Sequence, residues 1–164
     1  MSESEIRVFR LRMQYLLARF ESPDSARHPK RRDVVNFLEE INQLSDPLII
    51  ANILNMSSTI LENTLLHFAV ISRDPLLVER LVYSGHIDLI AENLQRETPR
   101  HIALDISETA SPQDPIFIIL EILNRARIGE HTGGKNKKIK QNRSNKKSKR
   151  KNKRNKRRTF RYFL

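Results

Sequence analysis

The sequence contains no cysteine, and this absence excludes several functions at once. Without cysteine there is no disulfide, no thiolate nucleophile and no cysteine-ligated zinc site. No apolar run approaches the length of a membrane span. Arg7, Arg10, Arg12 and Arg19 interrupt any apolar stretch near the N-terminus, so we expect no signal peptide. These absences favour a protein of the cytoplasm and nucleus that is not secreted.

Acidic residues are missing from one part of the chain only. Residues 135–164 hold 16 Lys or Arg and no Asp or Glu, whereas residues 1–134 hold the other 14 basic residues and all 19 acidic ones. The net charge of +11 therefore combines +16 in this tail with −5 in the rest. Residues 33–134 carry 6 basic against 15 acidic residues, a balance of −9. We predict an acidic folded body and a disordered basic tail, because the composition of the tail cannot form a core.

The N-terminal segment predicts an amphipathic helix over residues 2–20. Ser2 and Glu5 have the spacing of a capping box. Apolar side chains then recur every three or four residues, at Ile6, Phe9, Met13, Leu16, Leu17 and Phe20. Such a stripe covers the end of a neighbouring helical unit, or else the basic helix lies on a membrane or in a partner's groove. Residues 21–32, with two prolines and no apolar period, are typical of a linker.

Three aspartate–proline pairs predict three helix starts. Asp46-Pro47, Asp74-Pro75 and Asp114-Pro115 each precede apolar residues at helical spacing. Aspartate is a favoured N-cap, and proline suits the first helical position because an N–H there has no partner within the helix. We interpret the three segments as the second helices of three successive helix pairs, the third displaced by one residue.

A second pattern returns after 34 residues. The hexapeptide Thr-Leu-Leu-His-Phe-Ala at residues 64–69 recurs at residues 98–103 as Thr-Pro-Arg-His-Ile-Ala. The interval is one more than the roughly 33 residues of an ankyrin array, whose signature is T-P-L-H-x-A. We therefore expect repeat units at residues 60–94 and 95–127. Their structural positions are Thr64, His67, Ala69, Gly85, Thr98, Pro99, His101 and Ala103.

The repeat accounts for the two histidines without catalysis. A catalytic base needs a nucleophile or an acid as its partner, and the pattern around His67 and His101 specifies neither. We interpret both as residues that hydrogen-bond between neighbouring turns of an array. We predict no enzymatic activity, no catalytic residue, no cofactor and no metal site.

Residues 60–125 resemble ankyrin-repeat proteins, and the run 64–71, followed by Asp74-Pro75, resembles the inhibitor-of-kappa-B branch. The resemblance implies an all-α fold, with a short ankyrin solenoid of about three helix pairs at residues 33–130. An N-terminal helix and linker (1–32) precede the solenoid, and the tail (131–164) follows it.

The same resemblance implies a scaffold that binds a Rel-homology transcription factor of the NF-κB type and blocks its DNA binding or nuclear entry. A short array of this kind is similar to the shortened ankyrin proteins of polydnaviruses, which act against host immune signalling. The chain departs from the branch because it lacks a D-S-G phosphodegron and an acidic C-terminal segment.

The finger loops of such an array are the predicted contact surface for the partner. We assign the contacts to Glu62, Asn63, Glu92, Asn93, Gln95, Arg96 and Glu97. The negative body favours a basic partner. Arg96 stands where such fingers usually carry glycine, so either the turn is strained at positive φ or the finger takes another shape. Residues 107–113 lengthen the following link, as a contact site or as a neutral insertion.

The basic tail supports other hypotheses. The residues that fit a nuclear-import signal are Lys146, Lys147, Lys149, Arg150 and Lys151. The same charges favour RNA or DNA binding through counterion release, and Phe160, Tyr162 and Phe163 can stack on bases or insert into a membrane surface. The tail can also fold onto the acidic body. The alternative function is a nuclear adaptor whose tail binds nucleic acid while its repeats recruit another protein. A third is a membrane-surface adaptor that uses the first helix.

Overall fold

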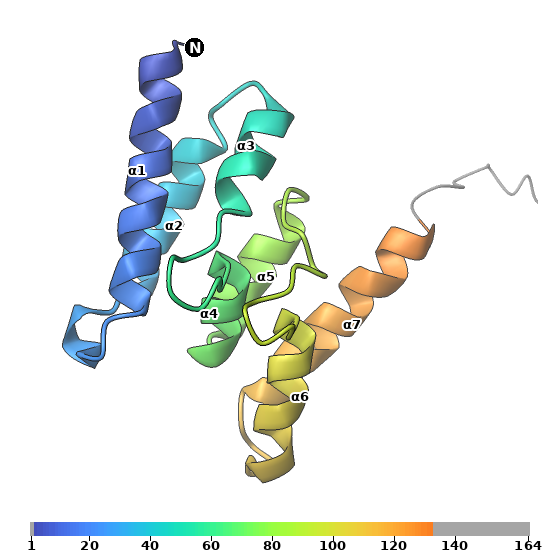
Figure 1. Cartoon of the computed structure of the whole chain (residues 1–164). Coiled ribbons are helices and arrows are strands. Elements are labelled where there is room, and N and C mark those ends of the chain that lie inside the picture. Colours follow the sequence, from blue (N-terminus) through green and yellow to red (C-terminus); the bar gives the residue numbers. More distant parts are fainter. Residues whose placement is uncertain (1, 133–164) are drawn as a thin grey trace, which may run out of the picture. The chain divides into compact units, whose positions relative to one another are not determined.

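All regular structure in residues 2–132, the part of the chain that the computed structural model describes, is helical (Figure 1). The helices are α1 (Glu3–Phe20), the 3-10 turn η1 (Ser25–Arg27), α2 (Arg31–Ile41), α3 (Pro47–Leu54), α4 (Leu65–Ile71), α5 (Pro75–Tyr83), α6 (Pro99–Thr109) and α7 (Ile116–Thr132). The prediction of an all-α fold is confirmed. None of the described helices is both long and apolar enough to cross a bilayer. The import motif predicted at residues 146–151 lies outside the described residues.

Helix α1 begins at the predicted capping box. The Glu5 backbone N–H donates to Ser2 Oγ (3.4 Å), and the Ser2 N–H donates to Glu5 Oε2 (2.7 Å). The two residues thereby satisfy donors that the first turn of a helix leaves free. The acidic side chains of Glu3 and Glu5 also lie at the positive end of the helix dipole, where negative charge is favourable.

The predicted apolar stripe of α1 is its inward face. Met13 is fully buried, and Phe9 meets Phe37 of α2 edge-on, with ring centroids 6.2 Å apart. Phe20 stacks on Phe68 of α4 at a centroid distance of 5.0 Å. The backbone of α1 also packs against α3. The helix therefore covers apolar surface of three later helices. This arrangement agrees with the expectation that the stripe covers the end of a neighbouring helical unit.

The predicted linker at residues 21–32 is shorter than expected. It contains the turn η1, and helix α2 already begins at Arg31. Glu21 Oε1 accepts hydrogen bonds from the backbone N–H groups of Ile60 (3.3 Å) and Leu61 (2.9 Å), so the segment is fixed to a later loop. Residues 2–132 belong to one compact unit.

The three aspartate–proline pairs begin three helices, as predicted. Asp46 Oδ1 accepts the N–H of Leu48 (2.9 Å) at the start of α3, and Asp74 Oδ1 accepts that of Leu77 (3.1 Å) at the start of α5. Asp114 Oδ1 accepts the Ile116 N–H (3.0 Å) at the start of α7. Each aspartate therefore satisfies a backbone donor that has no partner within its helix.

Two successive helix pairs, α4–α5 and α6–α7, form the second half of the described structure. Within the pairs α4 packs against α5 and α6 against α7; between them α4 contacts α6 and α5 contacts α7 (Figure 1). Leu66, Leu81, Ala103 and Ile119 are fully buried in these contacts. Because burial of a leucine stabilises a fold by about 2 kcal/mol, apolar packing is the main force that holds the pairs together.

The capping aspartates also join successive segments. Arg31 of α2 forms an ion pair with Asp74, and Arg73 forms one with Asp114. The aspartate side chains are only 13% and 10% exposed, so solvent screens these pairs less than it screens surface ion pairs. The same carboxylate thus starts one helix and fixes it to the preceding segment.

Candidate protein-docking surface

Two loops of similar position precede α4 and α6. In the first, the Ser58 N–H donates to the Asn63 carbonyl (2.9 Å), and the Asn63 N–H donates to Ser58 Oγ (3.1 Å). In the second, the Asn93 N–H donates to the Glu97 carbonyl (3.0 Å). Asn93 Oδ1 accepts the N–H groups of Gln95 (3.0 Å) and Glu97 (2.9 Å). The internal bonds close each loop into a tight turn.

Each loop turns through one residue of positive φ. Glu62 has a φ of 56° and Arg96 a φ of 60°, and both stand two residues before the threonine that caps the next helix. The strained turn foreseen for Arg96 is therefore the conformation present. A side chain with a Cβ costs about 1–2 kcal/mol in this region relative to the ordinary right-handed one. The hydrogen bond from the Arg96 N–H to the Asn93 carbonyl (2.9 Å) helps to hold it there.

Asn63 and Asn93 connect the two loops from inside. Asn93 Nδ2 donates to Asn63 Oδ1 (3.1 Å), and nearby the Leu94 N–H donates to the Leu61 carbonyl (2.9 Å). The two asparagines are 3% and 6% exposed, so little of either side chain is available for the partner contacts assigned to them. This corrects the assignment. The amide groups point inward because they supply the donors and acceptors that the turn backbones need.

His67 forms the second connection between the loops. Its side chain is fully buried, and its Nδ1 accepts the N–H of Thr64 at the start of α4 (3.1 Å). Its Nε2 lies 3.0 Å from the carbonyl oxygen of Glu97, which can only accept, so Nε2 carries the proton. Burial lowers the pKa of His67, against the smaller opposing effect of its bond to Glu97. The neutral ring joins two turns that lie 30 residues apart.

His101 repeats only the local half of this arrangement. The Thr98 N–H donates to His101 Nδ1 (3.4 Å), but the ring is exposed. No later loop of the same kind follows it within residues 2–132. Ala69 and Ala103, which follow the two histidines by two residues, are both fully buried, and Pro99 is buried at the first position of α6.

An open groove of about 390 Å³ lies between the loops and helices α4 and α6. Its lining residues are Leu61, Asn63, Ile71, Asn93, Gln95, Glu97, Ile102, Asp105 and Ile106. Exposed apolar side chains contribute to it, with Leu61 37% and Ile71 45% exposed. The groove therefore offers an apolar floor with carboxylates beside it, a combination typical of protein contact surfaces.

The predicted contact residues fall into two groups. Glu62, Glu92 and Arg96 are exposed and do not line the groove. Exposed Gln95, half-buried Glu97 and the buried Asn63 and Asn93 line it. Sequence reasoning missed five lining residues: Leu61, Ile71, Ile102, Asp105 and Ile106. The last three have the i, i+3, i+4 spacing of one helix face, which is the signal that could have identified them.

The groove and its loops are predominantly acidic. Glu62, Glu92, Glu97 and Asp105 carry negative charge at or near it, against the single positive charge of Arg96. Such a surface attracts a basic partner and repels an acidic one. Within the described residues no group of three or more His, Asp or Glu is arranged to hold a metal ion.

Comparison with known proteins adds no assignment to this geometry. The chain matches no protein-family model, no curated protein and no solved structure. Any function must therefore be inferred from the residues and contacts described above.

Proposed function

We propose that residues 33–130 form a short ankyrin-type repeat array that binds a protein partner along the groove between its loops and helices α4 and α6. The observation that carries the proposal is the bond from buried His67 to the Glu97 carbonyl, 30 residues later, beside the Asn63–Asn93 pair. These bonds connect equivalent loops of successive units, as a stacked array requires. They also hold the loops in place before binding, which lowers the entropy lost when a partner binds.

We further propose that the partner is a Rel-homology transcription factor of the NF-κB type, whose DNA binding or nuclear entry the chain blocks. The sequence resemblance of residues 64–75 to the inhibitor-of-kappa-B branch supports this choice. The acidic groove supports it independently, because a DNA-binding surface is basic. A chain with this activity suppresses immune signalling in the cell that contains it.

Recovery of partners from a cell extract tests this proposal. We expect the tagged full-length chain to retain a Rel-homology factor, and the double variant Glu92→Lys, Asp105→Lys to retain much less. Both positions are exposed, and Asp105 lines the groove. Glu79→Lys is the matched control, because Glu79 is exposed on α5 and does not line the groove. Recovery of no Rel-homology factor would remove the proposed partner.

The charge of residues 135–164 favours a second candidate, a nucleic-acid adaptor. With 16 basic and no acidic residues, this segment binds RNA or DNA with a steep dependence on salt. Deletion of residues 135–164 should then abolish nucleic-acid binding and leave retention of the protein partner intact. A full-length chain that binds nucleic acid but retains no protein through the groove would favour the adaptor.

A further inference from the structure

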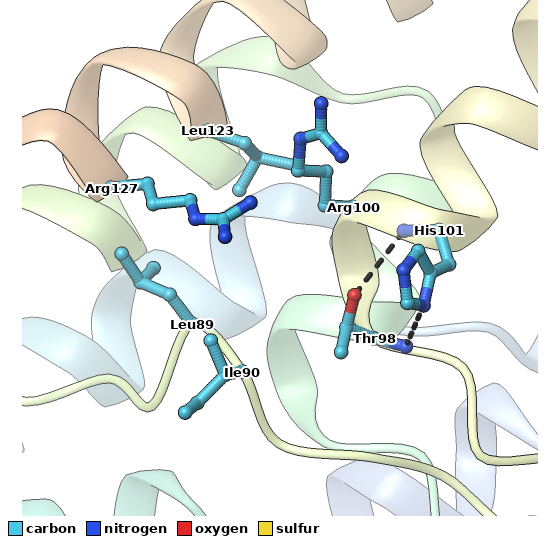
Figure 2. Close-up of a pocket in the computed structure, with 7 residues that line it drawn as sticks. All are labelled: Leu89, Ile90, Thr98, Arg100, His101, Leu123 and Arg127. Atoms are coloured by element: carbon cyan, nitrogen blue, oxygen red, sulfur yellow. Dashed lines mark hydrogen bonds between the residues drawn. The ribbon is translucent and has the colours of Figure 1, made fainter.

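A second pocket, which we call the arginine pocket, lies apart from the groove. It has a volume of about 160 Å³, and its lining residues are Leu89, Ile90, Thr98, Arg100, His101, Leu123 and Arg127 (Figure 2). These come from the loop before α6, the first turn of α6, and α7. None of them lines the groove, so a ligand here has its own recognition chemistry.

Two arginines give the arginine pocket a positive charge. Arg127 extends from α7 over Leu89 and Ile90, toward Arg100 of α6 (Figure 2). Among the side chains that the structure describes up to Arg127, no acidic residue lines the pocket and none forms an ion pair with either arginine. Arg100 uses its Nε–H on Asn124 Oδ1 (2.9 Å). A guanidinium has five N–H donors, so most remain for a carboxylate, which it binds through two parallel hydrogen bonds.

Three of the other lining residues, Leu89, Ile90 and Leu123, are apolar. Leu123 is buried, whereas Ile90 is 69% exposed. Apolar cavities of about 150 Å³ hold a molecule the size of benzene, so the volume here suits one leucine or phenylalanine side chain. The pocket thus combines space for one apolar group with two cations beside it.

His101 adds a backbone requirement. In the preceding unit His67 donates from Nε2 to the carbonyl of the next loop. His101 Nδ1 accepts the N–H of its own capping threonine, Thr98, as His67 Nδ1 accepts that of Thr64. Within the described residues, however, His101 Nε2 has no loop carbonyl as its acceptor. A chain segment that lies along this side can supply that carbonyl.

We propose that the arginine pocket binds a short extended peptide of a partner protein, in which an apolar side chain is flanked by carboxylates. The apolar group enters between Leu89, Ile90 and Leu123. The carboxylates bind Arg100 and Arg127, and a peptide carbonyl accepts from His101. A symmetric dimer through this pocket is a poor occupant, because contact between two such surfaces brings four arginines together without a carboxylate. The proposal uses no residue of the groove and does not depend on the function proposed for it.

The test measures binding of a labelled probe, acetyl-Glu-Glu-Leu-Phe-Glu-Glu-amide, to the full-length chain by fluorescence anisotropy. We expect the double variant Arg100→Gln, Arg127→Gln to bind about tenfold more weakly, since each exposed ion pair contributes a modest amount. Arg125→Gln is the matched control, because Arg125 lies on the same helix but pairs with Glu121 outside the pocket. Its affinity should stay unchanged.

The basic tail is present in every variant, so only the difference between chains reports the pocket. Equal affinity of the wild type and the double variant would show that the probe binds elsewhere and would overturn the proposal. A probe with Ser-Ser in place of Leu-Phe should bind the wild type and the double variant with the same affinity. If its affinities for the two chains still differ, or if inorganic phosphate displaces the original probe equally well from the wild type, the pocket is a simple anion site and the proposal is wrong.

A variant from the apolar side guards against loss of structure. Ile90→Glu introduces a negative charge at an exposed lining residue, and this charge repels the acidic probe. The variant should therefore bind the probe more weakly, as the double arginine variant does, with unchanged helical circular dichroism. Asp105→Lys, which alters the groove, should not reduce probe affinity. Failure of the peptide proposal is thereby separated from failure of the groove.

Discussion

Replacement of His67 and of His101 by alanine should have very unequal effects on stability. His67 is fully buried and bonds both the Thr64 N–H and the Glu97 carbonyl, whereas His101 is exposed and bonds only the Thr98 N–H, at 3.4 Å. Loss of His67 leaves a donor and an acceptor without partners, at about 1 kcal/mol or more each. The cavity left by the ring adds about 2 kcal/mol.

We therefore expect His67→Ala to lower the free energy of unfolding by about 4 kcal/mol and His101→Ala to lower it by less than about 1 kcal/mol. Urea denaturation followed by far-UV circular dichroism measures both. With a denaturant slope of about 2 kcal/mol per molar, the midpoints should differ by about 1.5 M. His67→Phe retains the volume but not the bonds, and should cost about half as much as His67→Ala. Equal losses of stability for His67→Ala and His101→Ala would refute the claim that His67 joins two loops whereas His101 does not.

Three further predictions concern single residues. Gly85→Ala should lower the free energy of unfolding by about 1 kcal/mol, because Gly85 follows α5 with a φ of 73°, which is unfavourable for alanine. An added Cβ would have no atom within 4 Å, so we expect no clash. A loss above about 3 kcal/mol in thermal unfolding would contradict backbone strain as the cause. Arg96→Gly should raise stability by about 0.5–1 kcal/mol in the same assay by removing strain at a φ of 60°, and a decrease would show that the turn is not strained. The pKa of His67 lies below its ordinary value of 6.5 because the ring is buried, so the unfolded chain takes up the proton first as the pH falls. The contribution of the neutral ring to the free energy of unfolding is therefore fully present above about pH 6.5 and decreases below it. Between about pH 7 and 5, the free energy of unfolding should fall less steeply for His67→Gln than for the wild type. Parallel curves for the two chains would exclude the effect.

Local signals located most helix starts because a cap depends on a few adjacent residues. Ser2 with Glu5, and the aspartates at 46, 74 and 114, act within three residues of themselves. Helix α2 was predicted to begin later than Arg31, because Lys30 at its N-cap makes no side-chain capping bond. The local cap that is present runs the other way, from the Lys30 backbone N–H to Asp33 Oδ2 (3.1 Å). The helix also depends on burial of one face, including Phe37, against α1. Such packing cannot be read from the residues around its start.

The contact surface was harder to predict than the helices. Asn63 and Asn93 look like ordinary polar loop residues, and their burial depends on each other across 30 residues. In α6 the spacing of Ile102 and Ile106 is the same as that of a core face, although both line the groove. The arginine pocket likewise depends on the placement of α7 beside α6, which no local pattern specifies. Periodicity identifies an apolar face but does not say whether another helix covers it.

Calorimetric titration of the purified full-length chain with a purified Rel-homology domain tests the proposed docking function most directly. We predict a single binding event with a dissociation constant of about 1 µM or lower, as for protein interfaces of standard size. Glu92→Lys, Asp105→Lys should weaken it strongly, whereas Glu79→Lys should leave it unchanged. No heat of binding, or equal affinity for all three chains, would contradict the proposal that the acidic groove is the docking surface for this partner.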